Sequence, residues 1–296
     1  MEKQPSATGS LSLHHWAKTW LNPPSRVKLT KTIKRQLYVA KYRLTRGAQL
    51  DIEKVRSDID PQVLDMSLPT GENLAVLVPL RDAADHIAPF LAALNELEYP
   101  KDRIKLVFCE GDSKDGSWDR LRDAVAPLES SYRSIVLLQK HLGSKLERDG
   151  RWKPKLQRMR RSGLAKVRNH LIEHGLDASD DWALWIDIDV WKFPKDIVHT
   201  LISKGHRIIV PNCVLTPGGK SFDHNSFVTT EPEKDYRYYR AMRGGLYQPP
   251  ENFIGRRHLS DVRHLEEIKL HGVGGTMLLV DAALHRGGLV FPEQPY

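Results

Sequence analysis

The sequence predicts an α/β protein with a mostly parallel central sheet flanked by helices. Apolar runs of strand length, of which Leu74–Leu80 is the first, alternate with segments whose apolar residues recur at helical spacing. Polar or acidic residues follow several of these runs directly, at Arg81, Glu110 and Asp187. Because parallel α/β sheets bind ligands outside the carboxyl ends of their strands, the same pattern also predicts where the site lies.

Each predicted element rests on a local pattern. Ile87, Phe90, Leu91 and Leu94 follow helical spacing, and Pro100 closes that helix. The predicted strands are 74–80, 104–109, 134–139, 182–186, 207–211 and 277–280. The other predicted helices are 116–128, with Trp118, Leu121 and Val125 on one stripe, the basic 155–175, and 193–202.

Composition is typical of a globular protein, with 40% hydrophobic and 28% charged residues among 296. Two cysteines cannot form a disulfide framework, and Cys109 in its apolar run is interpreted as a buried thiol. No signal peptide and no run of about 20 apolar residues is seen, so the sequence by itself predicts a cytoplasmic or peripheral membrane location. The net charge of +8 is concentrated in 26–56 and 133–168 and favours phosphate-bearing or anionic partners.

The chain divides into three parts. Residues 1–24 are interpreted as a flexible polar tail, and residues 25–72 as a basic helix followed by a linker. The helix, at 25–47, either packs on the domain with a solvated charged face or contacts an anionic membrane surface. Residues 74–296 form the main domain.

Asp187 and Asp189 are the leading candidates for a metal site. Two carboxylates two residues apart at the end of a buried strand repel each other unless a cation offsets the repulsion. Oxygen ligands suit Mn²⁺ or Mg²⁺, with positions left open for a substrate diphosphate. The alternative interpretation is a pair of solvated turn aspartates that cap the next helix.

Further polar segments are candidates for a nucleotide-binding role. Glu110 and Asp112 can bind a ribose or base, or they can simply form a turn. In the basic helix Arg161, Ala165, Arg168 and Asn169 share one face, and the arginines can pair with phosphate or remain solvated.

Two later segments are candidates for a role near a sugar. Asp223 and Asn225 carry the short polar side chains that suit sugar hydroxyls, although a turn explains them nearly as well. Gly274 and Gly275 belong to a glycine-rich turn that lets the backbone approach a ligand closely.

Other chemistries lose support. There is no phosphate-binding P-loop, nucleophile elbow or dinucleotide-binding glycine motif. The thirteen histidines are interpreted as scattered, with neither H-x-x-x-H nor H-E-x-x-H spacing, so a zinc site is not expected. The basic segments carry no recognised nucleic-acid-binding motif, and no nucleic acid is expected as a partner.

Together these segments resemble the Anp1/Mnn9/Van1 family of mannosyltransferases. The matching motifs are LVP at 77–79, LEYP at 97–100, LAKVRN at 164–169, WALWIDID at 182–189, FDHNSF at 222–227 and GVGGTMLLVDAALHRGGLVFP at 272–292. Phe222 and Phe227 stand where Tyr and Trp are more typical. Beyond the position of Tyr296 the family continues into an acidic segment and a histidine, so we expect a C-terminally truncated member and an incomplete domain.

The resemblance implies a GT-A-like domain that transfers mannose from GDP-mannose to a glycan acceptor with retention, using Mn²⁺. Asp187 and Asp189 would hold the metal, with Asp223 as a further catalytic residue. Asp223, Asn225, Gly274 and Gly275 would lie near the sugar or acceptor. The implied donor-binding residues are Pro79, Arg81, Glu110, Asp112, Arg161, Arg168 and Asn169.

The resemblance also implies a Golgi lumen location through a tether and a homo- or hetero-oligomer. The alternative function is a non-catalytic GT-A-like binding or scaffold subunit of a glycosyltransferase complex. A nucleotidyltransferase would share the sheet and the carboxylates.

Overall fold

The computed structural model describes residues 71–144, 146, 153, 156–229, 241–243, 246–248 and 256–294. The predictions for the tail at 1–24 and for the basic helix at 25–47 lie outside these residues. Within the described part of the chain, no helix combines the length and apolar character needed to cross a membrane.

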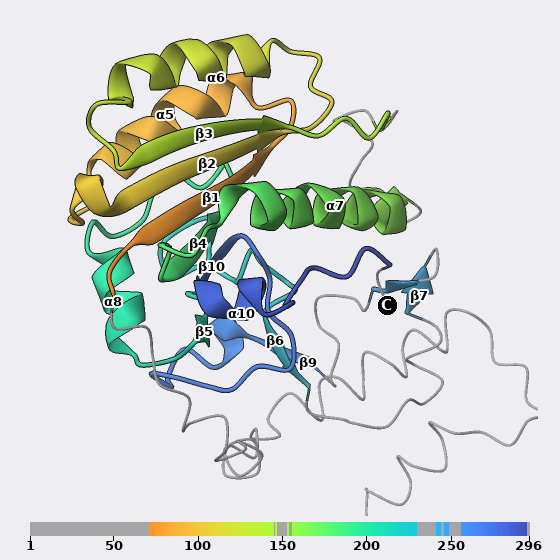
Figure 1. The fold of residues 1–296 in the computed structure, drawn as a ribbon. Coiled ribbons are helices and arrows are strands. Elements are labelled where there is room, and N and C mark those ends of the chain that lie inside the picture. The colour runs from red at the N-terminus through yellow and green to blue at the C-terminus, as the bar shows by residue number, and fades with distance from the viewer. Residues whose placement is uncertain are drawn as a thin grey trace, which may run out of the picture.

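A six-stranded sheet with the order β3-β2-β1-β4-β10-β5 forms the centre of the molecule (Figure 1). Its strands are β1 Leu74–Leu80, β2 Ile104–Glu110, β3 Ser134–Gln139, β4 Trp182–Ile186, β5 Ile208–Ile209 and β10 Met277–Asp281. The first four strands in this order run parallel, and β10 is antiparallel to both β4 and β5. The predicted fold class, a mostly parallel sheet flanked by helices, is therefore confirmed.

Helices cover both faces of the sheet (Figure 1). Alternate β1 residues point to opposite faces, as the strand period of two requires. Val76 and Val78 join the core under α5 Ala84–Asn95, α6 Ser117–Val125 and α8 Ile197–Ser203. Ala75 and Leu77 join a second core under α7 Gln157–Gly175 and α10 Ala282–Arg286. Because apolar layers cover both faces, β1 and β4 read as continuous apolar runs in the sequence, and β2 is apolar except for Lys105 and its last residue, Glu110.

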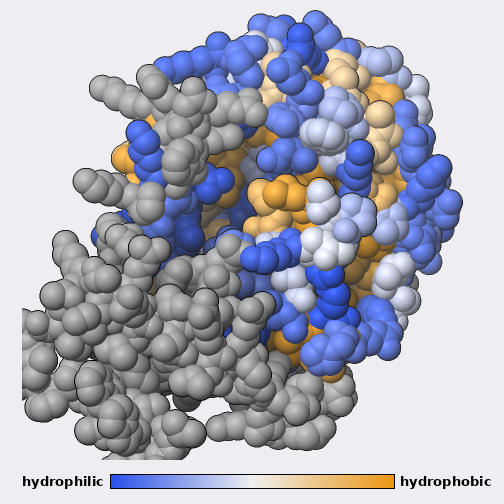
Figure 2. All heavy atoms as spheres, turned by 180° about the vertical axis from the view of Figure 1, so that it is seen from behind, coloured by the Kyte–Doolittle hydropathy of each residue, from blue (hydrophilic) through white to orange (hydrophobic). Residues whose placement is uncertain are grey.

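The remaining elements are short. β6 Phe227–Thr229 pairs with β9 Arg256–His258, and β7 Met242–Arg243 pairs with β8 Leu246–Tyr247. The 3₁₀ turns are Lys101–Arg103, Ala126–Leu128 and Leu259–Asp261. From behind, hydrophilic side chains cover much of the visible surface and leave separate hydrophobic patches between them (Figure 2).

Three predicted elements differ in detail from the structure. The helix predicted at 193–202 begins only at Ile197, whose N–H donates to the Pro194 carbonyl in a preceding turn. Of the strand predicted at 207–211, only Ile208–Ile209 pair with β10. In α6, Leu121 is buried as predicted, but Trp118 stays half-exposed at the side of the stripe.

The topology brings distant segments to one edge of the sheet. The carboxyl ends of β1, β2 and β4 meet there, because these strands are parallel. The antiparallel β10 begins at the same edge, and the Asp187 N–H donates to the Thr276 carbonyl at 3.0 Å. Residues after β4 and before β10 therefore lie side by side.

Candidate active site

A groove runs along the carboxyl ends of the central strands, between the sheet and α7. Its lining residues are Pro79, Leu80, Arg81, Gly111, Asp112, Leu142, Ser144, Leu146, Met159, Arg160, Gly163, Leu164, Val167, Asp187, Ile188 and Asp189. Five of the residues predicted from the sequence are in this set: Pro79, Arg81, Asp112, Asp187 and Asp189. The groove therefore lies where the strand-end rule places a ligand.

Asp187 and Asp189 both line the groove at the end of β4. Burial raises the pKa of Asp187 to about 6, the charges of Asp189 and Asp223 act in the same direction, and Arg168 opposes them. The Asp189 residue is exposed. A cation at this place would stabilise the ionised form of Asp187, which its surroundings otherwise disfavour.

Arg168 holds Asp187 in position. Its Nη2 donates at 3.0 Å both to Asp187 Oδ1 and to the Gly275 carbonyl. Its guanidinium also lies 5.0 Å from the centre of the Phe291 ring, a cation–π distance. A Cβ on Gly275 would meet Arg168 Nη1 at 2.5 Å, so only glycine leaves room for this contact.

Asp223 lies close enough to Asp187 for its charge to raise the pKa of that carboxyl, but it is not among the residues that line the groove. It is 8% exposed, and its Oδ1 accepts from the backbone N–H of Asn225 at 2.9 Å and from the side-chain amide at 3.2 Å. A Cβ on Gly274 would meet Asp223 Oδ2 at 1.7 Å. The predicted residues Asp223, Asn225 and Gly274 thus form one packed group.

The charge of Arg161 interacts with that of Asp223. Burial and the charge of Arg160 lower the pKa of Arg161, whereas Asp223 acts to raise it. The predicted face of α7 with Arg161 and Arg168 therefore turns toward the carboxylates of Asp223 and Asp187. The adjacent helix face, with Arg160 and Val167, lines the groove.

The acidic residues at the end of β2 and in the loop after it make hydrogen bonds within the protein. Glu110 is 3% exposed and accepts from the Ser113 N–H at 2.6 Å and from Gln139 Nε2 at 3.1 Å. Asp115 accepts from the N–H groups of Ala84 and Ser117. Both contacts fit the turn-forming interpretation of this loop.

Asp112 and Arg81 tie the groove to the segment after β3. Asp112 accepts from the N–H groups of Leu142 and Ser144, and Arg81 donates to Ser144 Oγ at 2.8 Å and to the Leu146 carbonyl at 2.6 Å. Burial acts to raise the pKa of Asp112, but these backbone N–H groups and the charge of Arg81 outweigh it and hold the pKa below 3.8.

Asn169 has partners other than the groove. Its Nδ2 donates to the Phe291 carbonyl at 3.0 Å, and the Phe291 N–H donates back to its Oδ1 at 2.9 Å. Nδ2 also lies 3.2 Å from Glu293 Oε1. Asn169 therefore anchors the segment that carries the Phe291 ring, which stacks on Arg168.

Sequence reasoning missed several residues near the site. Met159, Gly163 and Leu164 line the groove from α7, and their spacing with Arg160 was a usable signal because residues three and four apart share a helix face. Burial raises the pKa of Cys213 to about 12, and the charges of Asp223 and Asp187 act in the same direction. No local pattern in the sequence places that thiol near the carboxylates.

The interpretation of the histidines as scattered is wrong at one place. His170 and His174 stand four residues apart on α7, which is a spacing that puts two imidazoles on one helix face. With Glu173 they form a group whose ligand atoms all lie within 4.8 Å of one another.

The fold and the site define a class of protein. It is an α/β protein with two aspartates in a groove at the carboxyl ends of its parallel strands, where such sheets bind ligands. The Anp1 family model matches residues 62–295, and the chain belongs to the Anp1 family. The predicted family is therefore confirmed.

Curated relatives carry the names of mannan polymerase subunits. The mannan polymerase complex subunit mnn9 of Schizosaccharomyces pombe is 28% identical over 263 residues, which cover 83% of this chain and 75% of that protein. The mannan polymerase II complex ANP1 subunit of Saccharomyces cerevisiae is 29% identical over 242 residues, 75% of this chain and 48% of that protein. The chain thus spans about three quarters of the first relative and about half of the second.

Solved structures of glycosyltransferases are distant matches. The mannosyltransferase PcManGT from Pyrobaculum calidifontis, in complex with GDP-Man and Mn²⁺, aligns with a TM-score of 0.40 at 14% identity over 87% of this chain and 55% of that one. S. aureus TarS 1–349 aligns with a TM-score of 0.39 at 14% identity, covering 75% of this chain and 51% of that one.

Proposed function

We propose that this protein is a metal-dependent mannosyltransferase that transfers mannose from GDP-mannose to a glycan acceptor with retention of configuration. Membership of the Anp1 family and the names of the mannan polymerase relatives support the choice of mannose. The observation that carries the proposal is the pair Asp187 and Asp189 in the groove at the sheet edge.

The donor set fits Mn²⁺ or Mg²⁺. The ligands offered by Asp187 and Asp189 are carboxylate oxygens, which hard divalent cations prefer. Burial is the main cause of the raised pKa of Asp187, and the charges of Asp189 and Asp223 add to it. A bound cation would offset both effects by stabilising the ionised carboxylate. When bound, such a cation supplies a Lewis acid that neutralises charge on a departing diphosphate.

The chain's own residues divide the remaining tasks. Arg168 orients the Asp187 carboxylate through a hydrogen bond at 3.0 Å. Arg160 lines the groove and Arg161 lies near Asp223, so both guanidiniums are candidates for the donor phosphates. Asp223 and Asn225 are assigned to the sugar or acceptor. Pro79 and Arg81 line the groove at the end of β1.

We assign Asn169 and Glu110 roles in positioning and not in donor contact. Their side chains are engaged with Phe291 and with Ser113 and Gln139, respectively.

A hetero-oligomer with other glycosyltransferase subunits is the proposed assembly, because the relatives are named as subunits of complexes. The same names favour the second candidate function, a non-catalytic subunit that binds donor without transferring sugar. The proposed location is the Golgi lumen.

Turnover of GDP-mannose separates the two functions. Purified protein with Mn²⁺ and an α-mannoside acceptor is expected to form a mannosylated product. Asp189→Asn is expected to lower the rate roughly 100-fold or more, which is the scale of losing one electrostatic group in an active site. Asp123→Asn, at an exposed position on α6, is the matched control. GDP-mannose binding without product would favour the non-catalytic function.

A further inference from the structure

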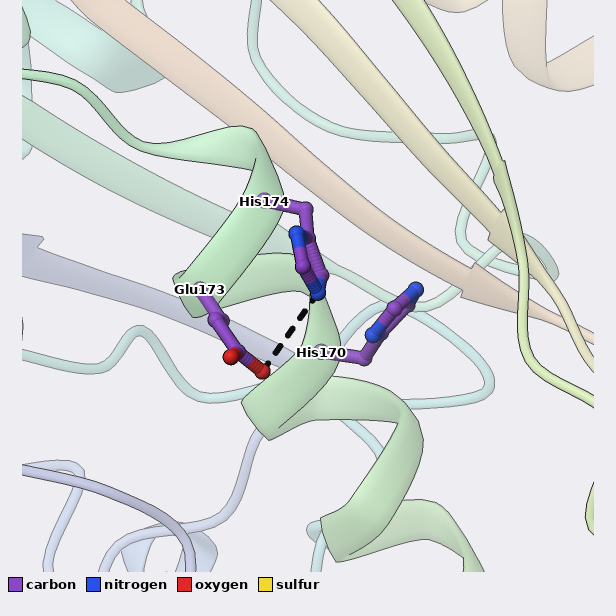
Figure 3. Close-up of side chains that lie close together, drawn as sticks. All are labelled: His170, Glu173 and His174. Carbon is purple, nitrogen blue, oxygen red and sulfur yellow. Dashed lines mark ion pairs between the residues drawn. The ribbon is translucent and has the colours of Figure 1, made fainter.

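A second group of potential metal ligands lies on the C-terminal half of α7. His170, Glu173 and His174 come from adjacent positions of one helix face (Figure 3). One ligand atom from each lies within 4.8 Å of the other two. Because one imidazole of the pair is four residues from the other, both reach the same side of the helix without any change of backbone.

The three side chains already face one another. The rings of His170 and His174 are 4.2 Å apart between centroids at an angle of 61°. Glu173 Oε2 lies 3.4 Å from His174 Nε2, and Figure 3 shows the carboxylate pointing at that ring with His170 beside it. Within the described residues, the buried Nδ1 of His170 has no hydrogen-bond partner.

The surroundings favour neutral imidazole at His170. Burial lowers the pKa of His170, the nearby His174 and Lys140 act in the same direction, and Glu173 opposes them.

The helix that presents these ligands is firmly held. Leu171, which lies between His170 and His174 in sequence, is fully buried in the core under α7. Gly175 packs so closely on the sheet that a Cβ would meet Val107 Cγ1 at 2.6 Å. Binding an ion would therefore order side chains only, and not the backbone that carries them.

We propose that His170, Glu173 and His174 form a binding site for a divalent transition-metal ion, with Zn²⁺ as the preferred ion. Two imidazoles and one carboxylate are a ligand set that zinc accepts, with a fourth position left for water or an added group. The oxygen-only pair Asp187 and Asp189 suits Mn²⁺ or Mg²⁺ instead, so the two places differ in metal preference. The bound ion would link consecutive turns of α7, the helix that also carries Arg168.

Zinc titration of the metal-free, untagged full chain tests this site. Isothermal titration calorimetry and thermal unfolding would be compared for the wild type, for Asp189→Asn, and for the double variant His170→Gln and His174→Gln. Glutamine keeps the helix propensity of these positions, and circular dichroism checks that α7 remains folded. His264→Gln, at an exposed histidine elsewhere, is the matched control.

We expect wild type, Asp189→Asn and His264→Gln to take up zinc alike, each with a higher Tm because the ion binds the folded chain. The double variant should bind one equivalent less, or bind that equivalent at least about 10–100-fold more weakly, which is the loss typical of removing only an outer-shell partner of a ligand. Mn²⁺ should not replace the lost equivalent. Equal zinc uptake by the double variant and the wild type would overturn the proposal, as would the absence of zinc binding by the wild type.

Discussion

Asp187 owes its position to close contacts that only small neighbours allow. Arg168 reaches Asp187 by passing over Gly275, and Asp223 packs against Gly274. Neither glycine is among those with positive φ, so the need for glycine here is one of space. The glycine-rich motif before β10 therefore acts by making room for two charged side chains of the site.

Alanine substitutions at two glycines should have opposite effects. In Gly274→Ala the added Cβ would lie 1.7 Å from Asp223 Oδ2, and overpacking of this kind costs about 1–3 kcal/mol or more. Gly163 is inside α7, and a Cβ there meets only Leu142 Cδ1 at 3.5 Å, so Gly163→Ala should add about 0.5–1 kcal/mol of helix stability. Urea unfolding measures the free energy of unfolding of both variants. An unchanged free energy in Gly274→Ala would contradict the close packing of Asp223 on Gly274.

Asp112 should make stability depend on pH. The pKa of this carboxyl lies below 3.8 in the folded chain, so its stabilising effect is present above the unfolded value of about 3.9 and is lost as pH falls through the folded pKa. Hydrogen bonds to a charged group contribute about 1.5–3 kcal/mol, and Asp112→Asn should lose a large part of this at pH 7. Unfolding free energies would be measured from pH 7 down to pH 3, and the difference between the two proteins should begin to narrow once pH falls below the unfolded pKa of about 3.9. A difference that stays constant over that range would contradict the assignment.

At the scale of elements, α7 joins most of the site. One face lines the groove, a second holds Arg161 and Arg168 toward the carboxylates, and Asn169 binds the segment after α10. The two hydrogen bonds between Asn169 and the Phe291 backbone resemble a pairing between strands. Through Phe291, this contact supports the guanidinium that orients Asp187.

Removing the Asn169 amide should loosen the segment after α10. Asn169→Ala deletes both hydrogen bonds to Phe291, each of which contributes about 0.5–1.5 kcal/mol. Hydrogen exchange of the Phe291 N–H should accelerate, while the Leu171 N–H in the buried part of α7 serves as the internal reference. Unchanged exchange at Phe291 would show that Asn169 does not anchor this segment.

Strong local patterns made several elements predictable. The apolar runs of β1 and β2 and the spacing of Ile87 to Leu94 in α5 lead directly to the observed elements, because burial on both strand faces or on one helix face leaves a clear period. The strand predicted at 207–211 is longer than the observed β5, because Val210 is apolar but does not pair with β10. The antiparallel direction of β10 depends on a long-range return of the chain that no local pattern encodes.

Within the candidate site, the residues at strand ends are predictable from the sequence, whereas the contacts of α7 are less so. Asp187 and Asp189 follow from the buried run of β4, and both line the groove. The sequence predicts the basic helix that becomes α7. Which face of that helix meets the groove depends on how the helix packs against the sheet. The partners of Asn169 and Glu110 were missed for the same reason, since both bind segments distant in sequence.

At the scale of the whole molecule, one sheet edge unites residues from β1 to β10. Parallel strands bring Arg81, Asp112 and Asp187 to that edge, and the antiparallel β10 returns Gly275 beside them. The groove therefore depends on the strand ends of β1 to β4 and on α7 docked against the sheet. Under the proposed function, a diphosphate and a cation would meet at this edge.

Metal-dependent binding of GDP tests the role of Asp187 and Asp189 most directly. Calorimetric titration of GDP into the protein, with and without Mn²⁺, would be repeated with Asp187→Asn and Asp189→Asn and with the control Asp123→Asn. The Asp187–Asp189 assignment predicts tight binding only with Mn²⁺, retained in the control and weakened at least about tenfold, or 1.4 kcal/mol, in either site variant. Wild-type Mn²⁺-dependent affinity in both site variants would contradict it.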